Sequence, residues 1–79
     1  MPTVRFFAQA REAAGAGSLQ ISGATVDEVL TAVVTQCGEP LARVIAISKV
    51  WVNGEEVPRS HAVTDKDEVA VLPPVSGGF

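Results

Sequence analysis

The C-terminal residues are the part of this sequence whose types and spacing could do chemistry. Pro73-Pro74 is followed by Val75-Ser76 and then by Gly77-Gly78-Phe79. The prolines favour an extended course, while the glycines have no side chain and wide backbone freedom. Such a tail can enter a narrow channel that bulkier residues would block. Gly-rich ends are also ordinary frayed termini, so the dipeptide alone leaves both interpretations open.

The other residues that could do chemistry have simpler structural explanations. Cys37 continues the apolar stripe of a predicted helix, which favours a buried structural cysteine over a nucleophile. His61 is the only histidine, and no cysteine or second histidine stands at ligand spacing, so the sequence predicts no metal site. The acids Asp65, Asp67 and Glu68 lack the pattern of a calcium loop. No Gly-rich phosphate loop follows a strand, so no bound cofactor is predicted.

Length and charge narrow the function further. A chain of 79 residues, 47% of them hydrophobic, predicts one small folded domain. A domain of this size cannot easily enclose both a substrate and catalytic groups, which favours a carrier, binding module or subunit without independent enzymatic activity. The net charge of −3 and the scattered cations argue against nucleic-acid binding. The acidity suits a partner with a basic docking surface.

Cysteine usage and hydropathy indicate the compartment. The single cysteine cannot form an intrachain disulfide. No signal segment opens the sequence, and no apolar run is long enough to span a membrane. The sequence therefore predicts a cytoplasmic protein that does not associate with membranes.

A helix and several strands are expected to position the tail. Thr25 and Glu28 form a capping box, and Gly38 with Pro40 marks the end of the helix, which is predicted over residues 26–37. Alternating apolar residues predict strands, and Asn53-Gly54 predicts a type I′ hairpin. The predicted strands are Pro2–Ala8, Ser18–Ser22, Lys49–Val52, Glu55–Val57 and Glu68–Leu72. Residues 9–17 are expected to form a loop with at most one helical turn, and residues 41–47 either a short helix or an irregular connection.

These elements predict an α+β fold in which a mixed sheet of about five strands packs on one main helix. Residues 1–72 are expected to form the domain. Residues 73–79 are expected to form an extended, flexible C-terminal tail.

The sequence resembles the MoaD/ThiS family of sulfur carriers, and MoaD most of all. The run VRFFAQAREAAG (residues 4–15) is similar to the MoaD opening, and TDKDEVAVLPPVSGG (residues 64–78) is similar to its ending. The capped helix and the Asn53-Gly54 hairpin lie between them in the family's order, so the resemblance covers essentially the whole chain. ThiS shares the diglycine more than the Pro-Pro-Val approach.

The resemblance implies the β-grasp, or ubiquitin-like, fold and a function in sulfur transfer. An activating enzyme of the MoeB or ThiF type adenylates the terminal glycine carboxylate with ATP, which the enzyme binds. A sulfur-donating protein then provides the sulfur that converts this group to a thiocarboxylate. The large subunit MoaE accepts the tail, and the pair forms molybdopterin synthase. Thiamine, cysteine or tRNA sulfur pathways, and a non-catalytic ubiquitin-like binding module, are the alternatives.

The resemblance and the strand register together suggest the site residues. Gly78 is expected to carry sulfur on its carboxyl group, with Gly77 beside it. Three large apolar side chains are expected on the sheet face opposite the helix, where they would dock partners: Phe7, Trp51 and Leu72. The resemblance adds Arg11, which either pairs with a partner carboxylate or is an ordinary solvated charge. The tail residues expected to contact partners are Pro73, Pro74 and Val75.

Phe79 departs from the family pattern, in which the chain stops at the second glycine. A benzyl side chain should obstruct a channel shaped for two glycines. Removal by a processing peptidase is the favoured explanation. An artificial extension, or loss of the carrier function, would also account for it.

Overall fold

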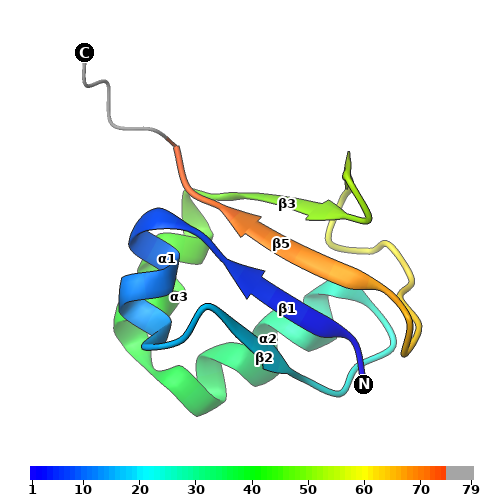
Figure 1. Cartoon of the computed structure of the whole chain (residues 1–79), viewed down its shortest axis with the longest axis horizontal. Coiled ribbons are helices and arrows are strands. Elements are labelled where there is room, and N and C mark those ends of the chain that lie inside the picture. Colours follow the sequence, from blue (N-terminus) through cyan, green and yellow to red (C-terminus); the bar gives the residue numbers. More distant parts are fainter. Residues whose placement is uncertain (75–79) are drawn as a thin grey trace.

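The computed structural model describes residues 1–74, which form a five-stranded sheet and three helices (Figure 1). The predicted tail residues 75–79 lie outside the described residues. The elements follow in the order β1 (Thr3–Phe6), α1 (Ala8–Ala14), β2 (Ser18–Gln20), α2 (Val26–Cys37), α3 (Glu39–Ala46), β3 (Lys49–Val52), β4 (Glu55–Glu56) and β5 (Glu68–Leu72). This architecture confirms the predicted α+β, β-grasp class.

The two terminal strands lie side by side within the sheet, whose strand order is β2-β1-β5-β3-β4. Strands β1 and β5 are parallel, with Val4 opposite Val69 and Phe6 opposite Val71. Alternation places these four side chains on one face of the sheet, and all of them are buried. The other strand neighbours are antiparallel, which makes the sheet mixed.

Helix α2 has the bounds that its capping signals predict. The Thr25 hydroxyl accepts a hydrogen bond from the Glu28 amide at 3.2 Å, and the Glu28 carboxylate accepts one from the Ala24 amide at 3.0 Å. The first turn therefore has side-chain partners for backbone donors that would otherwise be unpaired. Its apolar stripe is buried in the same core as the sheet valines: Val26, Val29, Leu30 and Val33.

The loop predicted for residues 9–17 is wrong over most of its length, because α1 spans Ala8–Ala14. Gly15 adopts a left-handed conformation (φ 73°) and donates its amide to the Arg11 carbonyl at 3.0 Å. The glycine thus ends a helix rather than preventing one. Strand β1 is correspondingly shorter than predicted, since Ala8 belongs to the helix.

The remaining elements follow the sequence closely. Strands β3 and β5 have the predicted bounds, and residues 41–47 prove largely helical as part of α3, with Leu41 and Ile45 buried. Asn53 and Gly54 both have positive φ, 51° and 88°, as a type I′ hairpin requires. No helix within residues 1–74 is long and apolar enough to cross a membrane.

Gly23 provides a test of packing at the entry to α2. A Cβ atom at this position would lie 2.7 Å from Val29 Cγ2 and 3.0 Å from the Val29 amide nitrogen. Because part of this clash is with backbone, Gly23→Ala should lower the free energy of unfolding by about 1–3 kcal/mol in urea denaturation. Gly17→Ala is the matched control, since its Cβ would meet only the Arg11 side chain at 3.6 Å or more. An equal loss in both variants would contradict the packing argument.

Asp67 provides a test of how the free energy of unfolding depends on pH. Its carboxylate accepts hydrogen bonds from the Asn53 side-chain amide at 2.9 Å and from the Thr64 backbone amide at 2.8 Å. These bonds hold the pKa of Asp67 below its usual value. These bonds therefore stabilise the folded state fully above about pH 3.9, the pKa of Asp67 in the unfolded chain. The stabilisation is lost as the pH falls through the lower pKa of Asp67 in the folded chain. Between about pH 5 and pH 2, wild type should lose more unfolding free energy than Asp67→Asn. Equal losses would show that the carboxylate contributes nothing.

Candidate docking face and tail root

The tail leaves the domain at the end of the sheet where β1 and β5 both finish and β3 begins (Figure 1). Leu72 closes β5, Pro73 is half-buried and Pro74 is exposed. Prolines cannot donate to a strand ladder, so the sequence itself ends the strand here. The predicted site residues Val75, Gly77 and Gly78, and also Phe79, lie outside the described residues.

Phe7 lies next to Leu72 at this end. The parallel register pairs Phe6 with Val71, so the following residues of the two strands emerge side by side. Phe7 is still extended (φ −125°, ψ 151°), whereas Ala8 has a left-handed φ of 50°. This sharp change begins α1 and leaves the Phe7 side chain 41% exposed.

Trp51 lies on the same sheet face as Leu72, away from α2 and α3. In the antiparallel pair β3–β5, Lys49 is opposite Leu72 and Trp51 is opposite Ala70, so Trp51 and Leu72 are diagonal neighbours. We call the surface formed by Phe7, Trp51 and Leu72 the docking face. The structure brings these three residues together as the strand register predicts, and their contact with partners stays a prediction.

Trp51 also carries an unpaired polar group that no sequence pattern indicates. Its ring is half-buried, and Nε1 is buried without a hydrogen-bond partner among the described residues. A buried Trp N–H usually finds an acceptor, and leaving a buried donor unpaired costs about 1–3 kcal/mol. The Trp51 N–H therefore lowers the stability of the isolated domain.

Arg11 is exposed on α1, close to Phe7. Both residues, with Arg5 and Ser18, line a hollow of about 310 Å³ between the end of β1 and the start of β2. The carbonyl of Phe7 accepts the Arg11 amide at 3.4 Å, which fixes the start of the helix beside the docking face. Arg11 therefore lies where a partner seated on the docking face could reach it.

The positions of Cys37 and His61 do not favour a catalytic or metal-binding role. Cys37 is half-buried, with its Sγ 3.9 Å from the Ala14 carbonyl oxygen, a position that suits the predicted structural role. His61 is exposed in a turn. Within residues 1–74, no group of three His, Cys, Asp or Glu side chains could hold a metal ion.

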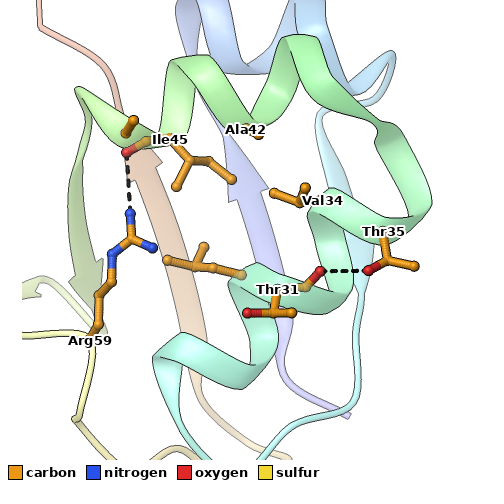
Figure 2. Close-up of a pocket in the computed structure, with 8 residues that line it drawn as sticks. Thr31, Val34, Thr35, Ala42, Ile45 and Arg59 are labelled. Atoms are coloured by element: carbon orange, nitrogen blue, oxygen red, sulfur yellow. Dashed lines mark hydrogen bonds between the residues drawn. The ribbon is translucent and has the colours of Figure 1, made fainter.

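A groove of about 280 Å³ lies between α2 and α3, on the opposite side of the sheet from the docking face (Figure 2). Apolar side chains, including Val34 and Ile45, form much of its wall, and the small residue Ala42 leaves the space open. Arg59 lies at one end, where its Nη2 donates to the Ile45 carbonyl at 3.5 Å. No sequence pattern indicates this groove, because its width depends on how the two helices pack.

Several solved structures are similar to this one over nearly the whole chain. SAMP1 from Haloferax volcanii is 32% identical with a TM-score of 0.83, covering 96% of this chain and 97% of that one. The BexX/CysO complex of Amycolatopsis orientalis contains a chain that is 29% identical with a TM-score of 0.82, covering 99% and 100%. The complex of subunits 1 and 2 of the molybdopterin-converting factor from Helicobacter pylori contains one that is 26% identical with a TM-score of 0.71, covering 96% of each chain.

No curated protein sequence matches the chain. The sequence profile of the ThiS family, in contrast, matches residues 4–78, from the first buried valine of β1 through both tail glycines. Together with the β-grasp architecture, this match shows that the chain belongs to the ThiS family of ubiquitin-like sulfur carriers.

Proposed function

We propose that the chain carries sulfur on the C-terminal carboxyl group of Gly78 after a peptidase has removed Phe79. The observation that carries this proposal is the extent of the family match, which runs through Gly77 and Gly78 and stops before Phe79. The domain elements support it, because the last strand ends at Leu72 and leaves residues 73–78, once Phe79 is removed, to reach into another protein.

The chemistry requires activation by a partner. A free carboxylate is a poor electrophile, so an enzyme of the MoeB or ThiF type joins it to the AMP moiety of ATP and releases pyrophosphate. Hydrosulfide released by a sulfur-donating protein then attacks the acyl carbon and displaces AMP, which leaves a thiocarboxylate. This chain supplies the carboxyl group and the docking surface, and ATP is bound by the partner. Because the route consumes ATP, we place the carrier in the cytoplasm.

Molybdopterin synthesis is the pathway that we favour, with a MoaE-like large subunit as the recipient of the tail. The Pro73-Pro74-Val75 approach to the diglycine supports this choice, as does the similarity to a chain in the molybdopterin-converting factor complex. The likeness to the chain in the BexX/CysO complex keeps other sulfur pathways open, including those of thiamine, cysteine and tRNA.

The fold also allows a function without sulfur. A non-catalytic ubiquitin-like binding module would use the docking face but not the terminus. SAMP1 is named a small archaeal modifier protein, and attachment of the activated Gly78 carboxyl group to another protein is a further alternative. Deletion of Gly78-Phe79 distinguishes the functions that need the terminus from the binding module. It abolishes sulfur transfer and covalent attachment, and it leaves non-covalent binding intact.

The state of the terminus provides a test of the proposed function. Intact mass spectrometry of the protein isolated from its native host should show a chain shorter by one phenylalanine residue. A fraction of that chain should have one carboxyl oxygen replaced by sulfur, because activation by the partner converts the Gly78 carboxylate to a thiocarboxylate. Retention of Phe79 on all molecules, with no exchange of oxygen for sulfur, would contradict the carrier function for this chain.

The docking face provides a test of partner binding. Phe7→Ala removes an exposed aromatic side chain next to the tail, and should weaken binding to the host's activating enzyme or large subunit by about 2 kcal/mol, as expected for an aromatic anchor. Isothermal titration calorimetry measures this change. The control is Gln20→Ala, on the same sheet face at the other end of β1. Equal affinities of the two variants, both folded by circular dichroism, would rule out Phe7 as an anchor.

A further inference from the structure

The groove between α2 and α3 has an apolar wall that the domain leaves uncovered. Leu30 and Val34 line it from α2, and Ala42 and Ile45 line it from α3 (Figure 2). Its volume is about 280 Å³. An apolar cavity of about 150 Å³ is enough to hold benzene, so this groove has room for a phenyl ring. A ring seated here would remove apolar surface from water on both sides, which favours its binding.

Arg59 is the one charged residue among those that line the groove. Its Nη2 donates to the Ile45 carbonyl at 3.5 Å, and its Nη1 lies 4.0 Å from Asp27, and both contacts are long. Asp27 weakens the positive potential only partly, because the pair is exposed to water. A guanidinium group has five N–H donors, so Arg59 can also bind a second carboxylate.

The Arg59 end of the groove lies close to the root of the tail. The Ile45 carbonyl that accepts Arg59 also accepts the Ser48 amide at 3.1 Å. Ser48 directly precedes Lys49, which is the strand partner of Leu72. Adjacent Cα atoms lie about 3.8 Å apart and paired strand residues about 5 Å apart, so Arg59 Nη2 lies within about 18 Å of the Leu72 Cα atom.

The tail is long enough to reach this cation. From Leu72 to Phe79 the chain advances by seven residues, which span about 23–25 Å when fully extended. The surplus length allows a path around the end of α3, and Gly77-Gly78 allows the chain to change direction. In a chain of 79 residues, Phe79 supplies both a phenyl ring and the terminal carboxylate. These two groups match the apolar wall and the cation at its end.

We propose that the groove between α2 and α3 is a docking site for Phe79 of the same chain. The phenyl ring enters the groove between Val34, Ala42 and Ile45, and the terminal carboxylate pairs with Arg59. Because tail and groove are joined by a short linker, the effective concentration of the tail is high and a modest affinity is sufficient.

This docking goes beyond the proposed function, since it concerns the chain before Phe79 is removed. A docked tail lies against the helices, on the opposite side of the sheet from the docking face, and cannot enter a partner's channel. Removal of Phe79 takes away the ring that fills the groove, and it moves the terminal carboxylate to Gly78, one residue further from Arg59. The processed tail is then free for a partner.

Release of phenylalanine by carboxypeptidase A tests this docking. The peptidase adds water across the Gly78–Phe79 peptide bond, which frees phenylalanine and leaves the carboxylate of Gly78. It acts only on a terminus that has left the groove. In the 79-residue chain, Arg59→Gln removes the cation and Ala42→Leu fills the groove. Arg43→Gln is the matched control, because Arg43 lies on α3 but does not line the groove.

We expect wild type to release phenylalanine about 10-fold more slowly than Arg59→Gln and Ala42→Leu at a fixed peptidase concentration, because only the undocked fraction is a substrate. Arg43→Gln should stay within about 2-fold of wild type. Dilution of the wild-type chain should leave its rate constant unchanged. Equal release from all four chains would overturn the proposal. Protection that weakens on dilution would also overturn it, by placing the tail in the groove of another copy.

A second measurement needs no variant in the folded domain. The backbone amide chemical shifts of the 79-residue chain and of the chain that ends at Gly78 should differ at Val34, Ala42 and Ile45. Differences confined to the end of β5 would overturn the docking. Neither measurement involves sulfur or an activating enzyme, so an empty groove would leave the proposed carrier function standing.

Discussion

The parallel pairing of β1 with β5 is the constraint on which the rest of the structure depends. It joins the first and last strands inside the sheet and buries the valines and the phenylalanine that α2 covers. Because the strands are parallel, their carboxyl ends lie at one edge of the domain. Phe7 and Leu72 therefore emerge together, and the tail begins next to an exposed aromatic side chain. A single pairing thus provides both the stability of the core and the geometry of the candidate site.

Local patterns in the sequence were sufficient to predict the bounds of several helices and strands. The capping box of α2 and the alternation of β3 and β5 are properties of neighbouring residues, so the predicted and observed bounds agree. Alternation along the strands also placed Trp51 and Leu72 on the face opposite the helices. Residues 9–17 end in two glycines, a pattern that favours a loop, but the left-handed conformation of Gly15 makes it the cap that ends α1.

Other features depend on contacts between distant parts of the chain. Sequence spacing indicates neither the groove between α2 and α3 nor the buried Nε1 of Trp51, which has no hydrogen-bond partner within residues 1–74. The position of Lys49 opposite Leu72, at the base of the tail, likewise follows from strand pairing rather than from sequence spacing.

ATP–pyrophosphate exchange with the host's purified activating enzyme tests whether the working terminus is Gly78. Adenylation is reversible, so a carboxylate that fits the enzyme's site incorporates labelled pyrophosphate into ATP. The chain that ends at Gly78 should support exchange, and the 79-residue chain should not, because its carboxyl group belongs to phenylalanine. Equal exchange with both chains, or none with either, would contradict a working terminus at Gly78.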